Sequence, residues 1–206
     1  MLISELAKEV HENAVAHGWW DEEREAPEIN ALIHSEWSEA LEEARAGRPL
    51  VYRVCGVCDD GPCYVEPGTA AYCGFIAEDR KPEGVAVELI DGCIRILDYM
   101  GRLKTEVAER EGVPSTIESL YTDYNVSRAP DKLPELISYL HMQTSLSIFA
   151  IDGKPRLAIT PNLFALVAAL AVALSWVKKQ GLDPLAILME KHEYNKGRPY
   201  KHGKRF

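Results

Sequence analysis

Two stretches decide the fold: HSEWSEALEEARAG at residues 34–47 and KPEGVAVELIDGCIRILDYMG at residues 81–101. In both, apolar residues recur at spacings of three and four, the pattern that places them on one face of an α-helix. Strand-like alternation of apolar and polar residues is nearly absent from the chain. The sequence therefore predicts an all-α fold in which these two helices pack through their apolar stripes.

The same periodicity, read with the positions of glycine and proline, predicts the other helices. Ser115-x-x-Glu118 resembles a capping box, and Asp183-Pro184 is typical of an N-cap followed by proline at the first helical position. Residues 48–82 are rich in glycine, proline and cysteine, so we expect a loop or small insertion there. We expect helices over residues 2–17, 28–46, 83–109, 115–124, 131–149, 160–181 and 184–197.

Charge and hydropathy exclude several classes of partner. The chain has 206 residues, a net charge of −9 and one basic cluster, at residues 196–205, so a nucleic-acid duplex is not an expected partner. The N-terminus lacks the basic and apolar regions of a signal peptide. The most apolar stretch, residues 163–177, is shorter than the roughly 18–20 residues that span a bilayer. We expect a cytoplasmic protein, without a membrane partner, in which this stretch is a helix buried on all sides.

Four carboxylates stand out because each pair lies three residues apart beside an apolar stripe. Such a pair shares a helix face. Packing the two stripes together would bring all four carboxylates into one cleft, where they would repel one another unless cations lay between them. Hard oxygen ligands favour Mg²⁺, with Mn²⁺ as a substitute. The alternative is an ordinary solvated acidic face. The residues are Glu36 and Glu39 on the first helix, and Glu88 and Asp91 on the second.

These motifs carry a resemblance to a known family. E-x-x-E within HSEWSEALEEARAG and E-x-x-D within KPEGVAVELIDGCIRILDYMG resemble the metal-binding helices of the MazG-like nucleotide pyrophosphatases. The ending KHEYNKGRPYKHGKRF is similar to the carboxy-terminal motif of small members of that family. One departure is that 48 residues separate Glu39 from Glu88, more than the family usually has, and the segment 48–82 supplies the excess.

The resemblance implies Mg²⁺-dependent hydrolysis of an NTP or dNTP to the monophosphate and pyrophosphate, in the role of nucleotide-pool housecleaning. It makes the four carboxylates the metal ligands, although Glu39 could instead orient the attacking water. Three tryptophans are candidate base platforms or, equally, core residues: Trp19, Trp20 and Trp37. His34 is expected beside the site or on the surface. The candidate substrate-binding residues are Lys191, Tyr194, Asn195, Arg198, Trp37 and Asn125.

The cysteines allow two interpretations. Four of them fall within the insertion and could hold a structural Zn²⁺, or they could be unligated thiols. Cys93 lies inside a predicted helix and is expected to be a small core residue. The candidate zinc ligands are Cys55, Cys58, Cys63 and Cys73.

A short internal repeat suggests how the chain is organised. The segment Asp123-Tyr124-Asn125-x-x-Arg128 resembles Glu193-Tyr194-Asn195-x-x-Arg198. We therefore expect a MazG-like repeat at residues 1–128 and a degenerate repeat at residues 131–206, unless the second half is an unrelated helical extension. The expected assembly is a homodimer, a higher homo-oligomer or an intrachain pseudo-dimer. Aligning the halves sets Glu36, Glu39, Glu88 and Asp91 against Leu140, Gln143, Ala165 and Ala168.

Two other functions remain open from the sequence. One is a nucleotide-binding or assembly module that keeps the fold without turnover. The other is an interaction protein stabilised by zinc at the cysteine-rich segment. The four carboxylates are all present in the first half of the chain, which favours the enzyme.

Overall fold

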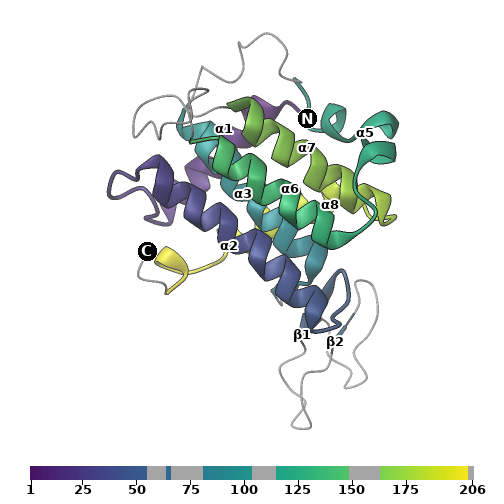
Figure 1. Ribbon diagram of the computed structural model, residues 1–206. Helices are drawn as coiled ribbons and strands as arrows, with labels where there is room; N and C mark the ends of the chain where they lie inside the picture. The colour runs from purple at the N-terminus through teal and green to yellow at the C-terminus, as the bar shows by residue number, and fades with distance from the viewer. Residues whose placement is uncertain (55–63, 66–80, 104–114, 149–162, 204–206) are drawn as a thin grey trace.

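A computed structural model describes residues 1–54, 64–65, 81–103, 115–148 and 163–203 (Figure 1). These residues are mostly helical, so the expected all-α character is confirmed apart from one small sheet. The helices are α1 (Ile3–Ala16), α2 (Ala26–Arg45), α3 (Val85–Arg102), α5 (Asp123–Arg128), α6 (Leu133–Leu146), α7 (Leu163–Lys179) and α8 (Pro184–Lys196), with the 3₁₀ helices η2 (Glu118–Tyr121) and η3 (Tyr200–Gly203).

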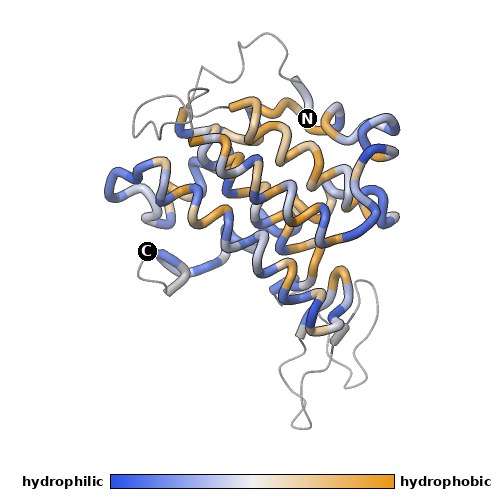
Figure 2. The backbone as a smooth tube through the Cα atoms, in the orientation of Figure 1, coloured by the Kyte–Doolittle hydropathy of each residue, from blue (hydrophilic) through white to orange (hydrophobic). Residues whose placement is uncertain are grey.

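Helix α3 is the centre of the bundle. It packs against α1, α2, α7 and α8, and α6 packs against both α2 and α7. The side chains of α3 are buried on nearly every face, because helices surround it. Figure 2 shows the apolar stretches of the chain running along the packed helices, while the short helix α5 is mostly hydrophilic. One hydrophobic core therefore joins the two halves of the chain.

Helix α7 is apolar and buried over most of its surface, as expected, but it is not buried on all sides, because Phe164 is 50% exposed. Among the described residues, no single helix has the length and apolar composition to cross a membrane. Helices α7 and α8 reach that length and composition only as a pair, and the chain bends by 110° between them.

A three-stranded antiparallel sheet corrects the expectation for the insertion. Strands β1 (Tyr52–Val54), β2 (Tyr64–Val65) and β3 (Pro82–Glu83) pair in the order β2-β1-β3. Strands this short contain too few residues to show an alternating pattern. Glu83 thus belongs to a strand, and α3 begins after Gly84, whose φ is +115°. A Cβ there would lie 2.6 Å from the carbonyl oxygen of Leu50, so the turn into α3 requires glycine.

The expected capping box at Ser115 and Glu118 is wrong. The Glu118 carboxylate instead accepts hydrogen bonds of 2.9 Å from the amino group of Met1. The segment forms η2 and then α5, which begins after Thr122, whose hydroxyl accepts a 3.4 Å hydrogen bond from the amide of Asn125. The Glu118 carboxylate, which the capping-box motif would place against a helix N-terminus, therefore pairs with Met1 instead.

The cap of α8 is as predicted, and the end of α3 is not. Asp183 Oδ1 accepts hydrogen bonds of 3.1 and 3.3 Å from the amides of Leu185 and Ala186. Helix α3 ends at Arg102 rather than at residue 109; residues 104–114 are outside the described part. The amide of Leu103 still donates to the carbonyl oxygen of Tyr99 at 3.1 Å, as in the helix before it.

The two halves of the chain pack in a reciprocal way. We call α2 and α3 the first helix pair, and α6 and α7 the second helix pair. Helix α6 lies on α2, and α7 lies on α3. Beyond the first pair the chain continues into η2 and α5, which pack on α7, whereas α8, beyond the second pair, packs on α3. The segment that follows each pair therefore covers a helix of the other pair.

Candidate metal centre

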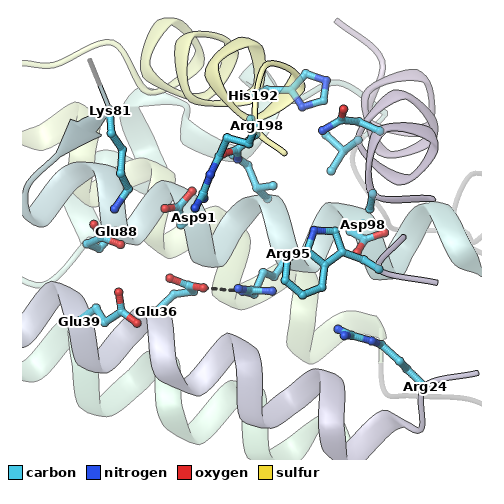
Figure 3. A pocket seen from close by; sticks show the side chains of 16 residues that line it. Arg24, Glu36, Glu39, Lys81, Glu88, Asp91, Arg95, Asp98, His192 and Arg198 are labelled. Carbon is cyan, nitrogen blue, oxygen red and sulfur yellow. Dashed lines mark hydrogen bonds and ion pairs between the residues drawn. The ribbon is translucent and has the colours of Figure 1, made fainter. Parts of the chain in front are cut away.

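A pocket forms where α1, α2, α3 and α8 meet (Figure 3). All four carboxylates selected from the sequence line it. Glu36 and Glu39 come from α2, and Glu88 and Asp91 come from α3, so the packing of the two apolar stripes places the pairs in one cleft.

Three of these carboxylates form a tight group. One oxygen from each of Glu36, Glu88 and Asp91 lies within 4.8 Å of the others. Glu36 is 6% exposed and Glu88 is 2% exposed, so the group sits at the bottom of the pocket. Glu39 is exposed and lies outside the group, although it lines the same pocket. We define Glu36, Glu88 and Asp91 as the carboxylate triad.

Burial and mutual repulsion perturb the triad. Burial, followed by the charge of Asp91, raises the pKa of Glu88 to about 8. Burial also raises the pKa of Glu36, and the neighbouring Arg95 offsets part of this effect. The Glu88 carboxylate makes no hydrogen bond or ion pair with a described residue. Such a buried group is stable only with a bound proton or with a cation beside it.

Two protein cations accompany the triad. Arg95 Nε donates to Glu36 Oε1, an ion pair between α3 and α2. Lys191 Nζ lies 2.8 Å from Asp91 Oδ2 and donates to the carbonyl oxygen of Pro82 at 3.2 Å. Lys191 is only 1% exposed and does not line the pocket. The expectation that Lys191 binds phosphate is therefore corrected, because its ammonium is held beneath Asp91.

The triad fits a hard divalent cation. All of its donor atoms are carboxylate oxygens, which Mg²⁺ and Mn²⁺ prefer. Glu88 has no competing partner among the described residues. Mg²⁺ commonly takes one or two carboxylates, several waters and substrate phosphate oxygens, so three protein ligands would leave room for a phosphate chain.

The rest of the pocket carries cations, amides and an aromatic ring. Trp19 lies there, with the guanidinium of Arg24 5.3 Å from its ring centroid. Asn13 and Asn195 line the pocket from α1 and α8. Arg198 extends above Asp91 in Figure 3 and forms no ion pair with a described residue. Among the expected substrate contacts, Asn195 and Arg198 are thus the two that reach the pocket.

Other candidate contacts lie elsewhere. Trp37 is 0% exposed, and its Nε1 donates to Thr144 Oγ1 at 3.0 Å, so it is a core residue rather than a base platform. Asn125 lies on α5, where its Nδ2 donates to the carbonyl oxygen of Leu120 at 2.8 Å. Tyr194 is half-buried and is not among the pocket-lining residues. The position of these residues in the sequence does not reveal which face of each helix borders the pocket.

Two further expectations concern tryptophan and histidine. Trp20 packs partly on the core, and its Nε1 donates to Asp98 Oδ1 at 2.9 Å. His34 lies on α2 and faces α6, with its Nδ1 2.6 Å from Nδ1 of His141. Neither residue lines the pocket. Burial lowers the pKa of both histidines.

The sequence interpretation missed several pocket residues. Arg95 follows Asp91 by one helical turn, so its position on the acidic stripe was the available signal. His192 is adjacent to Lys191 on α8, whereas Arg24 and Lys81 lie in connections where no periodicity exists. Residues in connections reach a pocket only through the path of the chain, and a helical pattern cannot reveal that path.

The cysteine predictions divide into two. Cys93 is 0% exposed on α3, which confirms it as a core residue. Cys55, Cys58, Cys63 and Cys73 lie outside the described residues, so the zinc site stays a prediction.

Comparisons with protein families, with curated proteins and with solved structures find no match to this chain.

Proposed function

We propose that the chain is a Mg²⁺-dependent nucleoside triphosphate pyrophosphohydrolase of the MazG-like type. The observation that carries this proposal is the carboxylate triad, in which one oxygen of each residue lies within 4.8 Å of the others and the buried Glu88 has no ion pair with a described residue. Bound Mg²⁺ would offset negative charge on the phosphate oxygens as the transition state forms. Glu36, Glu88 and Asp91 would hold it.

The remaining pocket residues suit a nucleotide. Arg198 forms no ion pair with a described residue and offers a planar fork of donors to phosphate oxygens. Lys81 supplies a second cation to the lining. Trp19 offers an aromatic face on which a base can stack. The pocket thus combines carboxylates for a metal, cations for phosphates and a ring for a base.

The exposed Glu39 has a different part in the proposed reaction. It lines the pocket without belonging to the triad, so its carboxylate is free to orient a water molecule and accept its proton. The water oxygen attacks the α-phosphorus, and the bond from this phosphorus to the bridging oxygen breaks. Pyrophosphate leaves with the bonding electrons, and the nucleoside monophosphate remains.

The test is to incubate the purified chain with each common NTP and dNTP in the presence of Mg²⁺. We expect equal amounts of monophosphate and pyrophosphate, and we expect ¹⁸O from labelled water to appear in the monophosphate. Release of orthophosphate would contradict the proposed bond cleavage. Mg²⁺-dependent nucleotide binding without any product would instead favour the binding or assembly module.

We also propose that the second helix pair takes the place of a partner subunit. The reciprocal packing supports this, because α8 covers α3 while η2 and α5 cover α7. In a pseudo-dimer of this kind, one chain supplies both the triad and the residues of α8. The alternative assemblies are a homodimer and a higher homo-oligomer. Light scattering on the full chain distinguishes them, and we expect the mass of one chain.

A further inference from the structure

Lys191 is an unusual component of a metal centre. Its ammonium comes from α8, is 1% exposed, and contacts Asp91 at 2.8 Å and the carbonyl oxygen of Pro82 at 3.2 Å. Burying an ammonium is unfavourable unless it is paired and hydrogen-bonded. Lys191 is buried and is not among the pocket-lining residues, so it is placed to pair with Asp91 rather than with a nucleotide. Lys191 therefore belongs to the centre itself.

Arg95 holds an equivalent position on the other side of the triad. It binds Glu36 across the α2–α3 interface, and its side chain is 27% exposed toward the pocket. A guanidinium keeps its charge at every pH at which proteins fold. Two of the three triad carboxylates thus form an ion pair with a built-in cation, whereas Glu88 forms none with a described residue and meets Lys191 and Lys81 only at longer range.

The neighbouring charges are balanced elsewhere. Lys81 Nζ lies 2.9 Å from Glu83 Oε1. The Asp98 carboxylate accepts a hydrogen bond from Trp20 and lies 2.7 Å from Nδ1 of His11. Arg24 likewise pairs with Glu28 outside the centre. With all carboxylates of the pocket ionised, the state that binds a metal, the centre has five negative charges, on Glu36, Glu39, Glu88, Asp91 and Asp98. Three positive charges accompany them, on Arg95, Lys191 and Arg198, so two negative charges remain. One divalent cation balances the remaining charge.

We propose that Lys191 and Arg95 act as resident counter-cations that limit the centre to one divalent cation in the absence of nucleotide. This inference rests on the proposed function, because it assumes that the carboxylates bind a metal. A resident cation repels an incoming metal ion, and the repulsion is strong at short range in a poorly solvated site. The chain thus keeps a buried acidic centre folded without metal, at the expense of metal affinity and of a second metal position.

The experiment measures how many Mn²⁺ ions bind per chain. Free Mn²⁺ gives an electron paramagnetic resonance signal that is lost on binding. The test variant is Lys191→Met, which removes the buried charge. The matched control is Lys196→Met, which removes the same charge from the same helix. Lys196 is half-exposed and pairs with Glu9 at 2.9 Å, and it is not among the residues that line the pocket.

We expect the wild type and Lys196→Met to bind one Mn²⁺ per chain with equal affinity. Lys191→Met should bind its first Mn²⁺ about tenfold more tightly, because a nearby positive charge is gone, and should take up a second ion more weakly. Two ions in the wild type would overturn the inference. Unchanged or weaker binding by Lys191→Met would also overturn it.

A second variant decides the matter if Lys191→Met does not fold. Arg95→Gln removes the other resident cation and leaves all three proposed metal ligands in place. We expect this variant to fold, as judged by circular dichroism, and to bind its first Mn²⁺ more tightly than the wild type. Unchanged or weaker binding by Arg95→Gln would contradict the charge-balance argument. Absence of Mn²⁺ binding by the wild type would contradict the proposed function itself.

Discussion

The two helix pairs have the same architecture and opposite chemistry. In the first pair, the triad lies at the bottom of a pocket with resident cations beside it. In the second pair, the aligned positions are apolar or neutral, and two of them are almost fully buried, with Leu140 0% and Ala165 5% exposed. The same packing thus accommodates either a solid apolar contact or a charged pocket. The second requires cations, of which Arg95 lies within the pair and Lys191 comes from outside it.

The segments that follow the two helix pairs also differ in the role of a matching asparagine. Asn195, beyond the second pair, lines the pocket. Asn125, its counterpart beyond the first pair, uses its amide to bind the carbonyl oxygen of Leu120. A repeated motif therefore has a candidate binding role in one half and a local structural role in the other. The two roles differ because α8 packs on α3, beside the pocket, whereas α5 packs on α7.

The largest expected effect comes from separating the pairs. A chain shortened to residues 1–128 would expose the face of α3 that α7 and α8 cover, and would leave Asp91 without Lys191. We expect it to lose cooperative unfolding and all pyrophosphate release, measured by urea denaturation and by product assay. A folded, active homodimer of this fragment would show that the second pair is dispensable.

The next effect distinguishes the four pocket carboxylates from the positions aligned with them. Glu88→Gln keeps the volume of the side chain and removes a charge that would bind the metal, so we expect pyrophosphate release to fall by about 100-fold or more. The control is Gln143→Ala, at the position aligned with Glu39, which should retain full activity. Circular dichroism should show the same helical content for both variants. Near wild-type rates for Glu88→Gln would exclude the triad as the centre.

A third comparison separates core tryptophans from pocket tryptophans. Trp37→Ala removes a fully buried side chain that packs on Gly92, and should lower the free energy of unfolding by about 3–5 kcal/mol. Trp19→Ala, in the pocket lining, should lower it by less than about 1 kcal/mol and should instead raise KM. Urea denaturation and steady-state kinetics measure the two quantities. A reversal of the two stability effects would mean that Trp37 is not a core residue.

The smallest effect concerns the contact between α2 and α6. Burial lowers the pKa of His34 and of His141, so these two side chains bind fewer protons in the folded chain than in the unfolded chain as the pH falls below about 6.5. Their contribution to stability should therefore be fully present above that pH and should decrease as the pH falls, whereas the raised pKa of Glu88 acts in the opposite direction. The loss should stay below about 1 kcal/mol, since both rings are half-buried and screened by solvent.

The measurement is the free energy of unfolding between pH 8 and pH 5. Relative to the wild type, His141→Gln should gain stability as the pH falls, because it removes one of the two groups that must charge, while the contribution of Glu88 is the same in both chains. The matched control is His17→Gln, a histidine at the end of α1 outside this contact. An identical pH dependence in the wild type and in His141→Gln would rule out the pair as the cause.

The sequence by itself determined the helices and the pairing of the carboxylates. Apolar spacing identifies the buried face of a helix, and residues three apart share a face, so Glu36 with Glu39 and Glu88 with Asp91 could be assigned to one cleft. The cap at Asp183 was also predictable, because an N-cap is a contact between near neighbours.

Only the tertiary structure decided which residues surround the carboxylates. Lys191 had the appearance of a phosphate ligand in the sequence, and its burial against Asp91 depends on α8 returning to α3. Trp37 became a core residue because α6 covers it, and Arg24 joined the pocket through the course of a connection. Local periodicity reports the face that a helix buries. The charge or ring that meets this face comes from a segment distant in the chain, and only packing can bring the two together.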